Sequence, residues 1–185
     1  MSELFIEGHR IGVLFSEADI AARITQLAHE IAERKPERLL VIPVLKGSFI
    51  FAADLIRAMH HAGLSPEVDF MILSSYRDAT RSSGQVQVLR DIETDVKDRD
   101  VLLIDDILES GRTLAFAKDL LSARGASHVF TAVLLNKPGH LAANIGADFQ
   151  GFECPDKFVV GYGMDMAHQF RELPFVGHVL TEATA

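Results

Sequence analysis

The densest group of chemically active residues in the chain lies between positions 101 and 114. Two adjacent carboxylates, Asp105 and Asp106, directly follow the apolar run 101–104. In an open parallel sheet, ligands bind beyond the carboxyl ends of the strands, so a strand over 101–104 would place both aspartates at the ligand-binding edge. Adjacent like charges are costly to bury without a partner. We therefore expect these carboxylates to face water, a cation or hydroxyl donors.

The small polar turn after the two aspartates predicts an anion site. A strand-to-helix turn presents free backbone N–H groups, which can hold a phosphate. Ser110 and Thr113 add hydroxyl donors, and Gly111 lets the backbone come close to a ligand. Carboxylates suited to sugar hydroxyls or a metal thus lie beside an anion site, which suits a sugar phosphate. The alternative is an ordinary turn with solvated acids.

Hydrophobic patterning predicts the elements that position this segment. Three short apolar runs are typical of buried strands, at 39–44, 101–104 and 129–135. Helices are predicted from the Ser16 cap to Lys35-Pro36, over 49–61 and over 112–123. A strand, a helix and a strand over 101–135 form a parallel βαβ unit with a right-handed crossover.

The remaining elements predict a hairpin and a second, smaller lobe. Strands are expected over 68–76 and 85–89, and the polar segment 77–84 joins them as a mobile loop, either a lid over the site or a tolerant surface turn. Further strands are expected near 158–160 and 176–180. The chain therefore reads as one α/β domain with a parallel central sheet and a smaller lobe built from the two chain ends.

Composition excludes several classes of protein. The 185 residues are 48% hydrophobic and 24% charged, which is ordinary for one globular domain. The net charge of −8 disfavours a nucleic-acid coat or a binder of anionic membranes, so we expect neither partner. No apolar run approaches the roughly 20 residues of a membrane helix, and no signal peptide is visible. The single cysteine, Cys154, cannot form an internal disulfide, which fits a cytoplasmic protein.

The 101–114 segment resembles the phosphoribosyl-diphosphate-binding motif of the type I phosphoribosyltransferases. Further motifs narrow the resemblance to the hypoxanthine-guanine phosphoribosyltransferases, and together they span most of the chain. They are Leu45-Lys46-Gly47-Ser48, Ser74-Ser75-Tyr76, Lys137, the run from Phe158 to Asp165, and Arg171 followed by Leu173-Pro174.

The resemblance implies both a fold and an activity. The fold is the type I phosphoribosyltransferase fold: a central, mainly parallel sheet flanked by helices, a small hood lobe and a flexible antiparallel hairpin loop. It implies a single domain over 1–185, with a core over about 37–150 and a hood formed by the N-terminal segment and about 151–185. The activity is purine salvage, in which 5-phosphoribosyl passes from phosphoribosyl diphosphate to hypoxanthine or guanine and gives IMP or GMP and pyrophosphate. It also implies a cytoplasmic homodimer or homotetramer.

The resemblance assigns residues to the phosphoribosyl diphosphate. Asp105 and Asp106 would receive the ribose hydroxyls and, with Asp165, hold Mg²⁺. A cis peptide bond is expected before Lys46. The ribose 5'-phosphate would bind at Ile107, Leu108, Ser110, Gly111, Arg112 and Thr113, and pyrophosphate at Lys46, Gly47, Ser75, Tyr76 and Arg171.

It also assigns residues to the purine. Glu109 is the candidate general base at N7, although the commonest family pattern has Asp there and Glu where this chain has Asp105. The Lys137 ammonium has donors only, so it favours an acceptor at the sixth purine position. Phe158 would stack on the purine, and the Val159 backbone would meet its far edge. Three alternatives stay open: a xanthine-preferring transferase, an enzyme for another base, and a nucleotide-sensing regulator that binds nucleic acid.

Overall fold

A large, mainly parallel sheet forms the centre of the computed structural model, which describes residues 3–6, 8–75 and 86–180. Its strand order is β6-β5-β3-β7-β8-β9, with β4 beside β3, and only the β5–β6 pair is antiparallel. The α/β fold expected from the sequence is confirmed. The strands are β3 (Leu40–Leu45), β4 (Glu67–Val68), β5 (Met71–Ser75), β6 (Val86–Arg90), β7 (Asp100–Leu108), β8 (His128–Asn136) and β9 (Phe149–Glu153).

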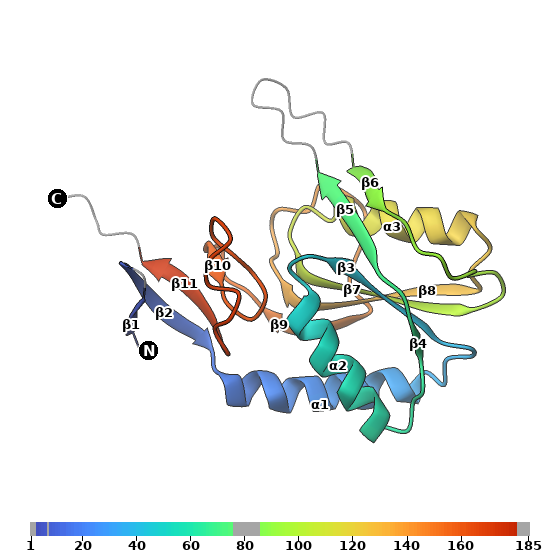
Figure 1. The fold of residues 1–185 in the computed structure, drawn as a ribbon, viewed down its shortest axis with the longest axis horizontal. Coiled ribbons are helices and arrows are strands. Elements are labelled where there is room, and N and C mark those ends of the chain that lie inside the picture. The colour runs from blue at the N-terminus through green and yellow to red at the C-terminus, as the bar shows by residue number, and fades with distance from the viewer. Residues whose placement is uncertain (1–2, 7, 76–85, 181–185) are drawn as a thin grey trace.

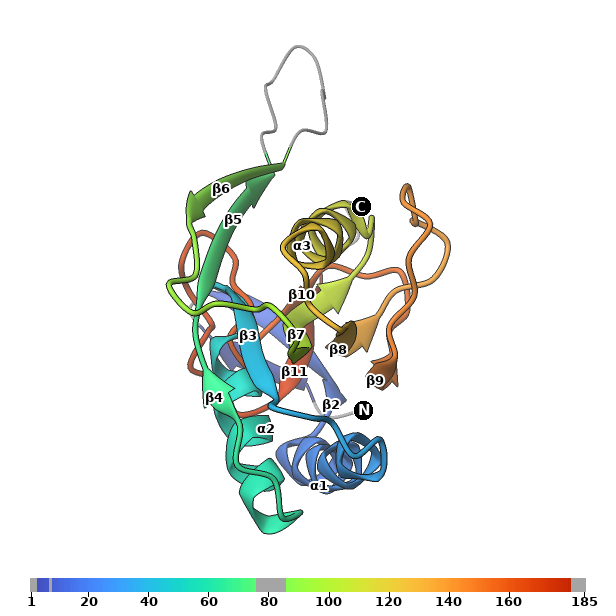
Figure 2. The ribbon, with the colours of Figure 1, turned by 90° about the vertical axis from the view of Figure 1, so that its right-hand side faces the viewer.

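Helices cover both faces of this sheet (Figure 2). Helices α1 (Glu17–Glu33) and α2 (Phe49–His61) lie on one face, and α3 (Arg112–Ala123) lies on the other. Side chains alternate along β7, so Leu102 and Ile104 pack with α1 and α2, whereas Val101 and Leu103 pack with α3. Burial on both faces explains why β3 and residues 101–104 of β7 are uninterrupted apolar runs in the sequence.

A second, antiparallel sheet brings the two ends of the chain together, with β1 and β2 next to β11 and β10 (Figure 1). A small apolar cluster that includes Ile11, Val160 and Phe170 packs there. The strands β1, β2 and β9 were not predicted from the sequence. The small sheet comprises β1 (Glu3–Ile6), β2 (His9–Phe15), β10 (Val159–Val160) and β11 (Val176–Leu180).

Two predicted strands differ from those observed. The strand expected over 68–76 is divided into β4 and β5 because the Asp69 carboxylate accepts the backbone N–H groups of Phe70, Glu93 and Thr94, at 2.7, 2.8 and 2.9 Å. Strand β7 continues past Ile104 to Leu108, because β8 is equally long and pairs with it throughout. The β5–β6 pairing confirms the hairpin, while its loop 77–84 lies outside the described residues.

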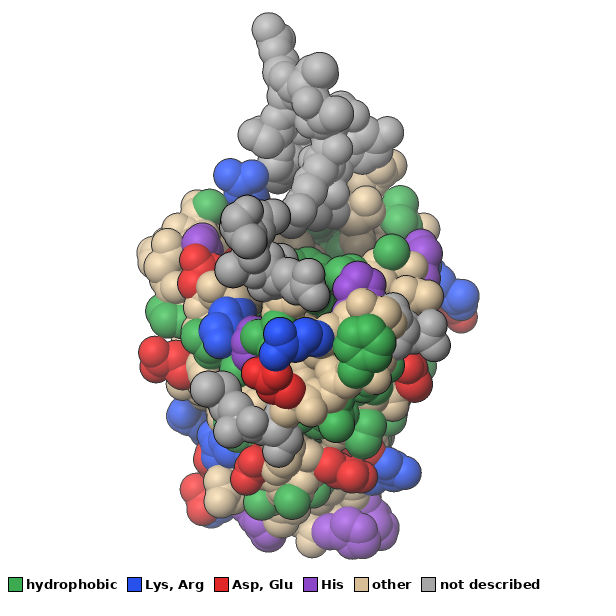
Figure 3. Space-filling view, turned by 90° about the vertical axis from the view of Figure 1, so that its left-hand side faces the viewer, with side chains coloured by type: hydrophobic (Ala, Val, Ile, Leu, Met, Phe, Trp, Pro, Cys, Tyr) green, Lys and Arg blue, Asp and Glu red, His purple; other side chains and the backbone are tan. Residues whose placement is uncertain are grey.

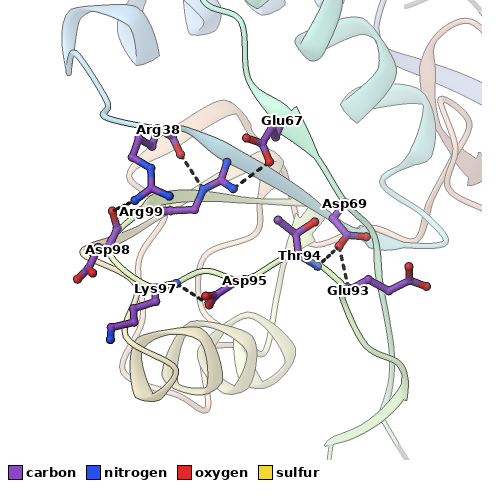
Figure 4. Close-up of polar contacts among 9 residues, drawn as sticks. All are labelled: Arg38, Glu67, Asp69, Glu93, Thr94, Asp95, Lys97, Asp98 and Arg99. Carbon is purple, nitrogen blue, oxygen red and sulfur yellow. Dashed lines mark hydrogen bonds and ion pairs between the residues drawn. The ribbon is translucent and has the colours of Figure 1, made fainter.

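Polar contacts of the buried Arg99 connect the amino ends of the parallel strands (Figure 4). Arg99, only 6% exposed, precedes β7 and donates to the Arg38 carbonyl at 3.0 Å and to Glu67 Oε2 at 2.9 Å. These bonds tie together the starts of β3, β4 and β7. These contacts lie at the amino edge of the sheet and leave its carboxyl edge accessible to ligands. No helix in the described part of the chain is long and apolar enough to cross a membrane.

Candidate active site

A cavity of about 470 Å³ opens at the carboxyl ends of β3 and β7. The chain after β3 enters it through the cis peptide bond Leu45-Lys46, as expected from the sequence. The structure therefore brings the turn after β3 beside the acid pair and the turn that opens α3. The described residues that line the cavity are Val44, Leu45, Lys46, Gly47, Leu73, Asp105, Asp106, Ile107, Leu108, Glu109, Ser110, Gly111, Thr113, Leu114 and His140.

The acid pair lies within β7 and is partly exposed to this cavity. Burial raises the pKa of Asp105 well above its ordinary value, and the neighbouring Asp106 charge raises it further. Burial also raises the pKa of Asp106. The hydrogen bond with Asp105 and the charge of Arg171 lower this pKa, but burial has the larger effect. A Cβ on Gly47 would stand 1.8 Å from Asp106 Oδ2, so any other residue at that position would force the Asp106 side chain to move. Two crowded carboxylates of this kind favour a cation or hydroxyl donors between them.

The anion turn is built around Gly111, whose φ of 72° is left-handed. Its carbonyl accepts the first helical bond of α3, from Ala115, so the preceding N–H groups at the helix start have no acceptor within the helix. The Ser110 carbonyl anchors the turn by accepting N–H groups from Ala142 and Ala143, at 2.9 and 3.2 Å. The side chain of Arg112 is exposed and does not line the cavity, so only its backbone belongs to the turn.

A second cavity, of about 330 Å³, adjoins the first. Both are lined by Asp106, Ile107 and Glu109, so Glu109 stands at the boundary between them. The Phe158 side chain is 59% exposed and therefore has an open face. The other described residues that line the second cavity are Lys137, Lys157, Phe158, Val159, Met164 and Asp165.

Lys137 is held at the end of β8, where its N–H donates to the Leu108 carbonyl at 2.9 Å. The residue is 8% exposed, and its ammonium donates to Glu109 Oε1 at 2.8 Å and to Asp156 Oδ1 at 3.1 Å. The hydrogen bond with Glu109 is the main cause of the raised pKa of Lys137, and it outweighs burial, which acts in the opposite direction. The side chain is therefore a buried cation with two anionic partners.

Asp156 and His140 were not singled out from the sequence. His140 Nε2 lies 3.1 Å from Asp156 Oδ1, and ligand atoms of Glu109, His140 and Asp156 all lie within 4.8 Å of one another. That spacing could hold a metal ion, but the Lys137 ammonium already bonds to both carboxylates. We therefore interpret the group as a compensated ion cluster. No spacing rule could have found it, because Asp156 lies in a loop distant from β8 in the sequence.

Asp165, which lines the second cavity, forms an ion pair with Arg171. Arg171 Nη2 lies 2.7 Å from Asp165 Oδ1, and Nη1 donates to the Gly163 carbonyl at 2.6 Å. Arg171 lines neither of the two cavities described above; it lines a third, of about 510 Å³, between α1 and α2. The sequence predicted a pyrophosphate contact here, whereas this structure places the guanidinium against Asp165.

The segment before Asp165 also touches the turn after β3. A Cβ on Gly163, whose φ is 98°, would stand 2.3 Å from the Gly47 carbonyl oxygen. The neighbouring Tyr162 hydroxyl donates to the Asp54 carboxylate on α2, and sequence reasoning missed this contact. Ser75 ends β5 opposite Val86, and Tyr76 lies outside the described residues.

Comparison with known proteins gives consistent matches. The model of the phosphoribosyl transferase domain family matches residues 14–167. A hypoxanthine phosphoribosyltransferase of Escherichia coli K12 is 39% identical, over 93% of this chain and 97% of its own length. A hypoxanthine-guanine phosphoribosyltransferase of Bacillus subtilis is 44% identical, over 89% and 91%. A crystal structure of a hypoxanthine phosphoribosyltransferase from Staphylococcus aureus superposes with a TM-score of 0.85 at 36% identity, over 94% of this chain and 93% of that one.

Proposed function

Because this chain belongs to the phosphoribosyltransferase family, we propose that it is a purine-salvage enzyme that transfers 5-phosphoribosyl from phosphoribosyl diphosphate to hypoxanthine or guanine. The products are IMP or GMP and pyrophosphate. The observation that carries this proposal is the pair of adjoining cavities. One combines an acid pair with an anion turn, the other contains a buried ammonium, and Glu109 borders both.

The first cavity suits the sugar phosphate. The helix-start N–H groups and the hydroxyls of Ser110 and Thr113 would hold the 5'-phosphate, as at other helix N-termini. Asp105 and Asp106 would accept hydrogen bonds from the ribose hydroxyls. This arrangement would direct the ribose C1 toward Glu109 and the second cavity. Lys46 and the Gly47 backbone would contact pyrophosphate from the turn after β3.

A divalent cation fits the donor set of this site. Carboxylate oxygens are ligands of the kind that Mg²⁺ prefers, and Asp105, Asp106 and Asp165, which line the two cavities, would hold it. The ion would supply a Lewis acid that neutralises charge on the departing pyrophosphate. Arg171 would keep Asp165 in place through its 2.7 Å ion pair.

The second cavity suits a 6-oxopurine. Lys137 offers only donors, so a carbonyl oxygen at the sixth position is favoured and an amino group is penalised. The exposed Phe158 ring would stack on the purine, and the Val159 backbone would meet its far edge. Glu109 would accept the proton at N7 as the nucleophilic ring nitrogen attacks C1. General-base help of this kind contributes roughly 10²- to 10⁴-fold in rate.

The regulator alternative receives no support from the surface that Figure 3 shows. Acidic, basic and apolar side chains are interspersed on that face, rather than forming one basic patch of the kind that binds nucleic acid. The net charge of −8 points the same way. We further expect a homodimer or homotetramer in the cytoplasm, as the family resemblance implies.

Pyrophosphate release tests the function directly. The assay contains the protein, phosphoribosyl diphosphate, Mg²⁺ and one of hypoxanthine, guanine, xanthine or adenine. We expect turnover with hypoxanthine and guanine and much less with adenine. A clear preference for xanthine would replace the proposed substrate, and no turnover with any base would favour the regulator.

A further inference from the structure

The Lys137 ammonium is shared between two carboxylates that come from different parts of the chain. Glu109 follows β7, whereas Asp156 lies in the loop between β9 and β10. The lysine side chain is 10% exposed, the Glu109 side chain 42% and the Asp156 side chain 67%. His140 Nε2 also lies 3.1 Å from Asp156 Oδ1, the same carboxylate oxygen that the Lys137 ammonium contacts. The cluster therefore has one buried cation and more negative charge than that cation needs.

We propose that Asp156 is a positioning residue for the transfer step: it keeps Lys137 compensated while Glu109 accepts the purine proton. The inference rests on the proposed function and deepens it. An ammonium has three donors, and two of those of Lys137 are engaged with carboxylates. The third can meet the purine carbonyl oxygen without loss of either ion pair.

The electron movements of the step explain why the second carboxylate favours it. The proton on purine N7 passes to a Glu109 carboxylate oxygen, and the N7–H bonding pair moves into the imidazole ring. The lone pair of the other imidazole nitrogen then forms the bond to ribose C1. The bond from C1 to the pyrophosphate oxygen breaks, and its electron pair leaves with pyrophosphate. Glu109 becomes a neutral acid, so Lys137 loses one of its two negative partners. Asp156 is then the carboxylate that still compensates the buried ammonium.

Asp156 therefore acts on the transition state more than on substrate binding. Before proton transfer, Glu109 alone can compensate Lys137, so the resting site tolerates loss of Asp156. After the transfer, a site without Asp156 contains a buried cation beside a protonated acid, which opposes the step. When an interaction is stronger in the transition state than in the ground state, its removal lowers the rate and leaves substrate affinity unchanged.

The experiment measures the single-turnover rate of IMP formation with saturating phosphoribosyl diphosphate, Mg²⁺ and hypoxanthine, so that product release does not hide the chemical step. Asp156→Asn removes the charge and keeps the shape. We expect this rate to fall about tenfold, the effect of weakening one charge-assisted hydrogen bond at a partly exposed site. The KM for phosphoribosyl diphosphate should stay within about twofold of wild type. Asp156→Glu, which retains the charge, should recover most of the rate.

Asp119→Asn is the matched control, because it makes the same charge change at an exposed position on α3. A normal rate for Asp156→Asn, or a loss shared equally with Asp119→Asn or with Asp156→Glu, would overturn the positioning role. A raised KM with an unchanged rate would also overturn it. If wild type forms no nucleotide from any 6-oxopurine, the proposed function itself fails, which is a separate result.

Discussion

Lys137→Gln should reduce the preference of this enzyme for 6-oxopurines. The lysine is 8% exposed and donates to Glu109 and Asp156 at 2.8 and 3.1 Å, so its ammonium is fixed in the base cavity. A hydrogen bond from a charged donor contributes about 1.5–3 kcal/mol. Its loss should lower kcat/KM for hypoxanthine by roughly 10- to 100-fold. A glutamine amide can also accept from an amino group, so the hypoxanthine-to-adenine ratio of kcat/KM should fall as well.

The matched control is Lys157→Gln. Lys157 lines the same cavity and loses the same charge, but its ammonium lies 3.1 Å from His178 Nε2 instead of bonding to Glu109. We therefore expect the control to change the hypoxanthine-to-adenine ratio much less. If Lys137→Gln leaves the ratio intact, or if Lys157→Gln lowers it equally, the assignment of Lys137 to the sixth purine position is wrong.

Three other predictions concern the acid pair and the segment that supports it. Asp105→Asn should abolish activity yet raise the Tm at pH 7 by about 3 °C, which corresponds to about 1 kcal/mol in a chain of this size. The pKa of Asp105 is raised in the folded protein, so the fold favours the protonated form and the charged form is destabilising at pH 7. The gain in Tm should vanish below about pH 4, where the carboxyl is protonated in the unfolded chain as well. Gly163→Ala should raise the KM for phosphoribosyl diphosphate severalfold, because the new Cβ would stand 2.3 Å from the Gly47 carbonyl oxygen; an unchanged KM would show that this contact does not position the turn. Tyr162→Phe should lower the free energy of unfolding by about 1–2 kcal/mol in denaturant titration, because the Asp54 carboxylate loses its phenol donor, with no change in base preference; an unchanged midpoint would refute that role.

The central layers of the fold were predictable because local and tertiary signals agree there. Helices α2 and α3 match their predicted ranges, since each has a polar turn before it and a glycine soon after it. The small sheet was only partly predictable. Strand β2 includes Gly12 and has just two buried residues, so its periodicity is weak, and it is defined by pairing with β11 from the other end of the chain.

The candidate site was also predictable only in part. Residues 105–113 form one local segment, so their carboxylates, hydroxyls and glycine indicate a ligand site from the sequence alone. The contacts of Asp156 with Lys137 and of Tyr162 with Asp54 join segments that meet only after folding. Nothing in their spacing predicts such contacts. Sequence reasoning therefore identifies groups that touch a ligand more readily than groups that hold them in place.

The two ends of the parallel sheet differ in how completely their charges are compensated. At the amino ends, the buried Arg99 guanidinium bonds to the Arg38 carbonyl and to Glu67, which stabilises the strand starts. At the carboxyl ends, burial raises the pKa values of Asp105 and Asp106, which means that the fold disfavours their charged forms. A ligand that brings a cation and hydroxyl donors removes this penalty, so part of its binding free energy comes from relief of unfavourable charge. The same residues that destabilise the free protein at neutral pH should therefore make phosphoribosyl diphosphate with Mg²⁺ a strong stabiliser.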